Sequence, residues 1–178
     1  MISIRTERPA DVAAREALLD VAYGPVRFTK PSQRLRERRD PALSFVAQEH
    51  GRVIGTVRLW PVAAGGRSAL LLGPLAVHPD CRRRGVGTAL MRRALRAAAE
   101  AGHAVVLLVG DAAYYGRFGF TAEKTGALTM PGPCEADRLL ALELAPGALD
   151  GAHGMIRVGM PRRPARRVAA AAAVANAA

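Results

Sequence analysis

The residues most suited to chemistry lie in a short turn with three arginines and two glycines, Arg82-Arg83-Arg84-Gly85-Val86-Gly87, followed by Thr88. Glycine has no Cβ, so it leaves backbone N–H groups open to a ligand. A helix start adds N–H groups without an internal acceptor and a partial positive charge. Residues 82–88 therefore predict a site for an anion such as a phosphate group. The alternative is a basic, glycine-containing helix start that binds nothing.

An apolar run precedes this turn and an amphipathic segment follows it. Residues 70–77 have the length of a strand, and residues 86–98 have the period of a helix. One half of the helical wheel carries Val86, Leu90, Met91, Ala94, Leu95 and Ala98, and the other half carries Arg92, Arg93, Arg96 and Glu100. Residues 70–102 therefore predict a strand, a tight turn and a helix. Gly73-Pro74 indicates either a bulge in this strand or simply its start.

Several other chemistries are disfavoured by the residue spacing. The turn lacks G-x-x-x-x-G-K-[ST], and Leu90 occupies the third glycine position of G-x-G-x-x-G. Cys81 and Cys134 have no metal-ligand spacing and give no disulfide framework, so we expect no metal and a reduced, cytoplasmic setting. Ser44 and Ser68 lack the surroundings of a covalent nucleophile.

Length and composition indicate one domain with a packed core. The chain has 178 residues, of which 50% are hydrophobic, and no apolar run reaches the about 18 residues of a membrane helix. A change of composition at Pro161 predicts a domain over residues 1–160 and an Arg/Ala-rich tail over residues 161–178. The tail lies beyond the last predicted strand, so we expect the fold to persist without it.

The net charge of +11 favours acidic partners, and it raises the alternative of a basic nucleic-acid-binding protein that uses residues 27–39 and the tail. Those segments interleave no aromatic side chain for base stacking beyond Phe28, and no DNA-binding motif is present. We therefore expect no specific nucleic acid and no membrane partner.

The rest of the chain predicts further strands and helices. We expect strands over residues 2–5, 43–49, 52–61, 104–109, 138–144 and 155–160, and a helix over residues 10–22. The order from 43 to 77 implies an antiparallel meander, and that from 70 to 109 implies a parallel pair with a right-handed crossover. Residues 27–39 carry six basic residues, and a second helix is expected to start at Pro31.

Two stretches resemble a known family. Arg82 to Gly87 fits the [QR]-x-x-G-x-[GA] motif of the GNAT superfamily of acetyl-CoA-dependent N-acetyltransferases, and residues 75–80 resemble its preceding strand and turn. Residues 109–120 resemble its FY-x-x-x-GF element. The resemblance covers about residues 1–160 and points to a bacterial branch of predicted acetyltransferases. It implies a single-domain α/β fold: a mixed, mostly antiparallel, twisted sheet with helices on both faces.

The resemblance also implies an activity, the transfer of an acetyl group from acetyl-CoA to a primary amine by direct attack. It implies that the pyrophosphate of acetyl-CoA is held by Arg82, Arg83, Arg84, Gly85, Val86, Gly87 and Thr88, and the pantetheine arm by Leu75, Ala76 and Val77. It aligns Tyr115 with the tyrosine that protonates the departing thiolate, a role that suits a phenol. Tyr114 is an alternative acid, and a third interpretation has both tyrosines only packing in the core.

The resemblance leaves the base and the acceptor open. Many members use a glutamate on the central strand, but residues 70–77 contain no acid, so Glu49 and an ordered water are the substitutes. The missing acid keeps a non-catalytic acetyl-CoA sensor as a second function. The acceptor is a small-molecule or peptide amine, and a homodimer is left open. The resemblance places residues 27–39 beside the acceptor as a lid, whereas the residues alone indicate a solvated helix or loop.

Overall fold

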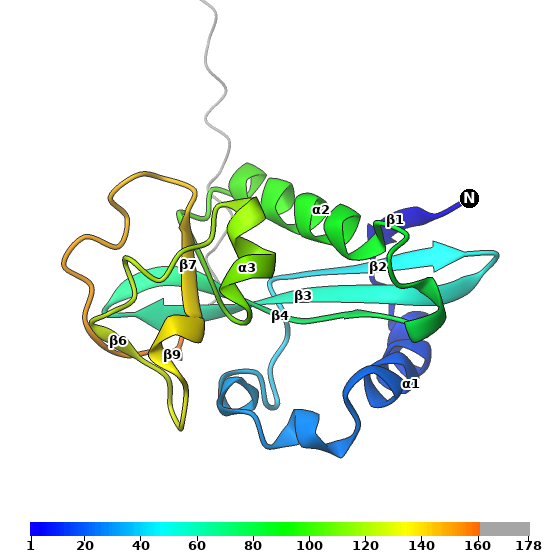
Figure 1. Cartoon of the computed structure of the whole chain (residues 1–178), viewed down its shortest axis with the longest axis horizontal. Helices are drawn as coiled ribbons and strands as arrows, with labels where there is room; N and C mark the ends of the chain where they lie inside the picture. Colours follow the sequence, from blue (N-terminus) through cyan, green and yellow to red (C-terminus); the bar gives the residue numbers. More distant parts are fainter. Residues whose placement is uncertain (161–178) are drawn as a thin grey trace, which may run out of the picture.

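The computed structural model describes residues 1–160, which are built around one twisted sheet (Figure 1). Within these residues the sheet has seven strands, in the order β1-β2-β3-β4-β5-β7, with β9 paired to β3. Its strands are β1 (Ser3–Thr6), β2 (Leu43–Glu49), β3 (Arg52–Ala64), β4 (Arg67–Val77), β5 (Val105–Val109), β7 (Leu139–Glu143) and β9 (Arg157–Val158). Within this sheet of the described chain, β4 and β5 are the one parallel pair, as the sequence predicts.

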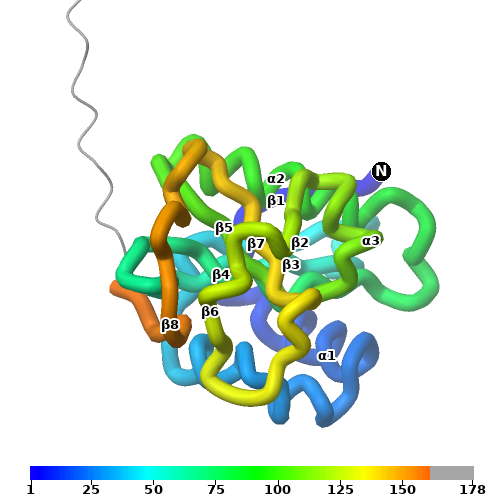
Figure 2. Tube along the Cα trace, turned by 60° about the vertical axis from the view of Figure 1, so that its left-hand side comes forward, coloured from blue at the N-terminus to red at the C-terminus, as the bar shows by residue number. Residues whose placement is uncertain are grey.

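Helices cover both faces of the sheet. The helix α1 (Val12–Tyr23) lies on one face and α2 (Val86–Glu100) on the other, with the short α3 (Ala112–Tyr115) after β5 (Figures 1 and 2). Short 3-10 helices span Pro9–Asp11, Pro25–Phe28, Pro31–Leu35, Pro79–Cys81, Gly116–Phe118 and Ala136–Arg138. This arrangement confirms the α/β class and the helices on both faces of the sheet.

Among the described helices, none has the length and apolar character needed to cross a membrane.

The packing of α2 fixes the position of its N-terminus. Val86, Leu90, Met91, Ala94 and Ala98 are buried as predicted, whereas Leu95 is half-buried and Ala97 is buried instead. Burying one leucine such as Leu90 contributes about 1.5–3 kcal/mol. Gly55 of β3 makes the close approach possible, because a Cβ there would lie 2.9 Å from Leu90 Cδ1. The turn at the start of α2 is therefore held firmly against the sheet.

The sheet opens between β4 and β5. Their pairing consists of Leu70 with Val106 and Leu71 with Leu107. Beyond that point β4 stays paired with β3 up to Val77, and β5 stays paired with β7. Both strands therefore continue without each other, and a gap separates them.

The Gly73-Pro74 pair forms a bulge rather than the start of the strand. Val57 of β3 is opposite Leu75, but Leu59 is opposite Leu72, so the register shifts at this pair. Gly73 has φ +135°, a backbone conformation that glycine adopts readily. The bulge therefore lies in β4 where β5 leaves it.

Two predicted elements are wrong. The expected strand over 155–160 is split into β8 (Gly154–Met155), which pairs with β6 (Leu128–Thr129), and β9, because fully buried Ile156 anchors the chain between them. The expected helix from Pro31 is a short 3-10 helix, Pro31–Leu35, because Leu35 is its only buried apolar residue and no apolar stripe continues beyond it. The predicted tail, residues 161–178, lies outside the described residues.

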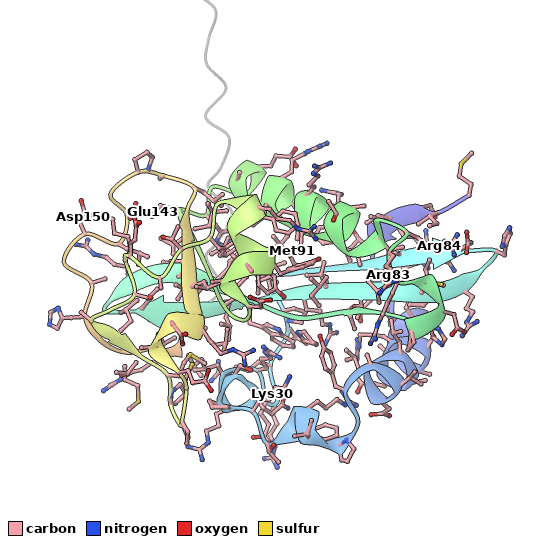
Figure 3. All side chains as sticks on the ribbon, in the orientation of Figure 1. Lys30, Arg83, Arg84, Met91, Glu143 and Asp150 are labelled. Carbon is pink, nitrogen blue, oxygen red and sulfur yellow. The ribbon has the colours of Figure 1, made fainter. Side chains whose placement is uncertain are left out.

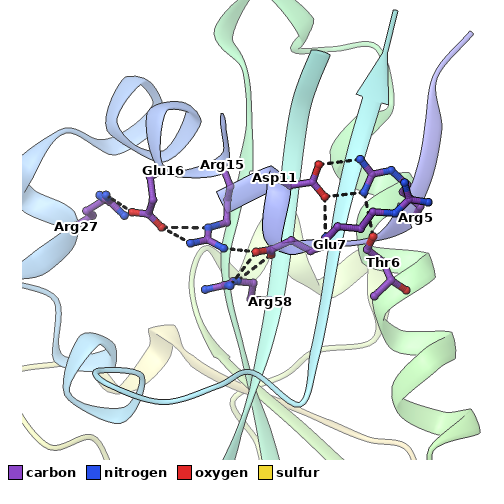
Figure 4. Close-up of polar contacts among 9 residues, drawn as sticks. Arg5, Thr6, Glu7, Asp11, Arg15, Glu16, Arg27 and Arg58 are labelled. Atoms are coloured by element: carbon purple, nitrogen blue, oxygen red, sulfur yellow. Dashed lines mark hydrogen bonds and ion pairs between the residues drawn. The ribbon is translucent and has the colours of Figure 1, made fainter. Parts of the chain in front are cut away.

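Buried charges join α1 to the sheet (Figure 4). The side chains of Glu7 and Arg15 are 5% and 6% exposed and form an ion pair. Glu7 also accepts hydrogen bonds from Arg58 of β3 at 2.9 and 3.0 Å. Arg15 bonds Glu16 at 2.7 Å, and Glu16 bonds Arg27 at 2.6 Å. This network ties α1 and the following 3-10 segment to β3.

We expect Glu7→Gln to destabilise the fold by about 3 kcal/mol, because it leaves two desolvated guanidinium groups without their shared carboxylate. Urea unfolding measures the change. Asp150→Asn is the matched control: it breaks the exposed Lys124–Asp150 pair, so it should cost no more than about 1 kcal/mol. Equal losses in the two variants would contradict this interpretation of the network.

Candidate active site

The turn before α2 presents unpaired backbone donors. Arg83 and Gly85 have left-handed backbones, with φ +61° and +77°. The N–H groups of residues 83–88 donate to no acceptor within residues 1–160. Alternating backbone conformations of this kind form a concave nest of N–H groups that suits an anion. The structure thus places the predicted anion-site residues at a turn with free N–H groups.

Arg84 and Glu49 hold this turn in place. Glu49, at the end of β2, accepts hydrogen bonds from Arg84 at 2.6 and 2.9 Å, and these bonds lower the pKa of its carboxyl. Arg83 and Arg84 lie at the β4–α2 turn (Figure 3). The structure thus makes Glu49 an anchor of the turn, with the carboxylate engaged, rather than a base poised in a cleft.

Tyr114 and Tyr115 diverge from one short helix. The ring of Tyr115 packs near Phe120, with centroids 6.1 Å apart, and against Gly110, where a Cβ would clash with it. Tyr115 is half-buried, and its hydroxyl bonds no group within the described part of the chain. Burial raises the pKa of Tyr115. The hydroxyl therefore stays protonated at neutral pH.

Tyr114 is directed toward the turn instead. Its hydroxyl lies 3.0 Å from the position that a Cβ on Gly87 would occupy. The guanidinium of Arg117 stacks on the Tyr114 ring at 4.1 Å from its centroid. The Tyr115 side chain therefore lines a cleft, whereas the Tyr114 hydroxyl lies beside the nest of N–H groups.

A cleft of about 1090 Å³ lies on the α1 side of the sheet. Its wall comes from one face of α1, residues 27, 28, 30–33 and 36–40, Arg58 and Trp60 of β3, Leu72 to Leu75 of β4, Val109, Tyr115, and residues 133–135 and 138. It therefore borders the gap between β4 and β5. Residues 27–39, expected either as a lid or as a solvated segment, form one wall of this cleft.

The predicted strand residues lead from the cleft to the turn. Leu75 lines the cleft, and Ala76 is buried against α1 in one apolar cluster. A methyl carbon of Val77 lies 3.6 Å from the Cβ position of Gly87. Leu75, Ala76 and Val77 therefore connect Tyr115 and the cleft with the nest at residues 83–88.

Two aromatic donors at the bulge were missed by sequence reasoning. Trp60 Nε1 donates to the carbonyl oxygen of Gly73 at 2.6 Å, and the Tyr23 hydroxyl donates to that of Leu75. Both side chains occupy ordinary apolar positions in a strand and a helix. No local sequence signal marks them, because their partners are 13 and 52 residues away.

Comparison with known proteins agrees with this geometry. The sequence model of the Acetyltransferase (GNAT) family matches residues 13–120. The chain is 33% identical to the N-acetyltransferase YhbS of Escherichia coli K12 over 156 residues, 86% of this chain and 93% of the relative.

Two solved structures extend the likeness. The crystal structure of Escherichia coli YhbS in complex with CoA has a TM-score of 0.77 at 32% identity, and the match covers 88% of this chain and 89% of that one. A GNAT family acetyltransferase from Brucella melitensis in complex with acetyl-CoA has a TM-score of 0.69 at 30% identity, covering 90% and 97%. The chain therefore belongs to the GNAT family of acetyltransferases and is an acyltransferase.

Proposed function

We propose that this enzyme transfers the acetyl group of acetyl-CoA directly to an amine that enters the cleft. The observation that carries the proposal is the course of β4 from the cleft to the turn, along an edge that β5 does not cover. Unpaired N–H groups lie at one end of this edge, and the cleft that Tyr115 lines lies at the other. The CoA and acetyl-CoA complexes of the two related structures support the same donor.

The turn supplies the donor site in this proposal. The N–H groups of residues 83–88 donate to the pyrophosphate of acetyl-CoA, and the α2 dipole adds positive potential there. Arg82 and Arg83 are exposed beside them, whereas Arg84 holds the turn through Glu49. The pantetheine arm follows Leu75, Ala76 and Val77, where β5 no longer covers the edge of β4.

The reaction needs few protein groups because a thioester is already activated. The lone pair of a neutral amine attacks the acetyl carbonyl carbon, and the carbon–sulfur bond then breaks. Tyr115 donates its hydroxyl proton to the departing thiolate, and burial keeps that proton in place beforehand. Because Arg84 engages Glu49, water in the cleft takes the proton from the nitrogen.

A screen of amines for the release of free CoA tests this function. Release that depends on both the enzyme and an amine supports transfer. Tight binding of acetyl-CoA with no release for any amine would favour the non-catalytic sensor. The primary nature of the amine, the cytoplasmic setting, the homodimer and the lack of a specific nucleic-acid partner stay predictions.

We expect Gly85→Glu to weaken acetyl-CoA binding by about 100-fold or more, because it adds a negative charge where the pyrophosphate binds. Gly51→Glu is a matched control. Both glycines have nearly the same φ, +77° and +78°, and open space around the Cβ position. Calorimetry should show wild-type affinity for the control. Comparable affinity in Gly85→Glu would mean that the donor site is misplaced.

We expect Tyr115→Phe to lower kcat by roughly 10- to 1000-fold, with the affinity for acetyl-CoA little changed, because the variant loses only the proton donor. Tyr114→Phe should instead leave kcat near wild type and alter at most the KM for acetyl-CoA, since its hydroxyl lies over Gly87. Steady-state kinetics with both substrates measures the difference. Full turnover by Tyr115→Phe when chemistry limits the rate would refute the acid assignment.

A further inference from the structure

Arg36 enters the cleft without a partner. Its side chain makes no hydrogen bond or ion pair with any other group in residues 1–160, and its Nε is fully buried without an acceptor. Desolvation lowers its pKa to about 10, so the guanidinium is charged at neutral pH. Arg36 is half-buried overall, and a partly desolvated charge without a counter-ion is unfavourable unless a ligand supplies one.

The guanidinium of Arg36 lies against the bulge of β4. A Cβ on Gly73 would lie 2.9 Å from Arg36 Nη2, so a larger residue there would push the end of the Arg36 side chain aside. The bulge itself is held by Trp60 through the Gly73 carbonyl. The guanidinium therefore lies against the part of β4 that borders the gap, in the cleft that Tyr115 also lines.

The charges around Arg36 are predominantly positive. Desolvation, followed by the positive charges of Arg36 and Arg138, lowers the pKa of Lys30, so these three cations face a common space. The Lys30 ammonium lies 4.6 Å from the centroid of the Tyr23 ring (Figure 3 labels Lys30 on the α1 side of the sheet). All three line the cleft and none forms an ion pair within the described residues, so they disfavour a cationic ligand and favour an anionic one.

The carboxylates on the cleft wall do not neutralise Arg36. Glu16 is bound to Arg15 and Arg27. The other three acidic residues of the wall, Glu37, Asp40 and Glu135, are exposed, and none forms an ion pair within the described chain. The planar fork of an arginine matches a carboxylate in two parallel hydrogen bonds.

We propose that Arg36, with Lys30 and Arg138 around it, binds a carboxylate of the acceptor, and that the acceptor is an amino acid or a related small amine carrying a carboxylate. This proposal rests on the proposed acetyl transfer and specifies its substrate class. The carboxylate holds the acceptor at the bulge while its amine faces the acetyl end of the donor.

A paired panel tests the proposal in the CoA-release assay. The probes are the twenty common amino acids, the carboxamide of each, which lacks the negative charge, and spermidine as a purely cationic amine. We expect the best acid to exceed its carboxamide by at least about tenfold in kcat/KM, the size of one charge-assisted hydrogen bond. Calorimetry of the same probes with CoA-saturated enzyme measures binding without turnover.

Variants assign the effect to Arg36. Arg36→Gln should lower kcat/KM for the acid by about 10- to 100-fold, bring the acid-to-amide ratio near one and leave acetyl-CoA affinity unchanged. Arg34→Gln is the matched control, because Arg34 is exposed on the same segment and does not line the cleft; it should change the ratio by less than about fivefold. If Arg36→Gln does not fold, Arg36→Lys carries the test, because lysine keeps the charge but loses the fork.

Each outcome decides between the two proposals. A preference for carboxamides or spermidine, or an unchanged ratio in the Arg36 variants, would overturn the carboxylate site while acetyl transfer stands. Loss of acetyl-CoA affinity in Arg36→Gln would assign Arg36 to the acetyl-CoA binding site instead. That result would also overturn the carboxylate site. Acids that bind the wild type but not Arg36→Gln, with no CoA released from any amine, would support the carboxylate site and refute acetyl transfer. If acids neither bind to the enzyme nor are acetylated by it, the carboxylate site is refuted.

Discussion

The separation of β4 from β5 is the constraint on which the rest of the structure depends. Two paired positions hold these parallel strands together, at Leu70 and Leu71, and then each strand follows its other neighbour. A sheet edge inside a folded domain leaves backbone groups without partners, which is costly unless a ligand or a side chain supplies them. In this fold the Tyr23 hydroxyl satisfies the Leu75 carbonyl, and an extended pantetheine arm would satisfy further groups.

Glycines make the close approaches around this opening possible. Gly55 admits α2 against β3, Gly73 admits Arg36 against the bulge, and Gly110 admits the Tyr115 ring. A Cβ would come within 3.0 Å of a neighbouring atom at each of the three positions. The helix α2, the Arg36 guanidinium and the Tyr115 ring can therefore take these positions because the three glycines have no side chains. Substitutions at these glycines should move functional groups even where the fold survives.

Much of the fold could be predicted from the sequence because its signals are local. The strand–turn–helix of residues 70–100 and the antiparallel meander of residues 43–77 follow from periodicity, and Gly73-Pro74 indicated the bulge as one of two alternatives. Residues 154–160 could not be predicted, because their pairing depends on distant β3 and β6 rather than on their own pattern. The strand order and the opening of the sheet are equally non-local.

The candidate site divides in the same way. The turn proposed to bind the pyrophosphate and the proposed acid Tyr115 could both be named from the sequence, because their motifs are contiguous in the chain. Arg36 was one of six basic residues in residues 27–39, and nothing in its neighbours in the sequence marks it as the one whose Nε is buried without an acceptor. Trp60 and Tyr23 were missed because a side chain that supports a bulge has no sequence signature of its own. The sequence therefore predicted candidate residues for the acetyl-CoA half of the site, whereas candidates for the acceptor half could be identified only from the three-dimensional arrangement.

A crystal structure of this enzyme with bound CoA tests the central claim, that one gap beside β4 links the nest of N–H groups with Tyr115. The account predicts that the pyrophosphate oxygens accept hydrogen bonds from the N–H groups of residues 83–88. It also predicts that the CoA sulfur lies within hydrogen-bond reach of the Tyr115 hydroxyl and that Arg36 makes no contact with CoA. A pyrophosphate held by Lys30, Arg36 and Arg138 in the cleft, or a sulfur remote from Tyr115, would contradict it.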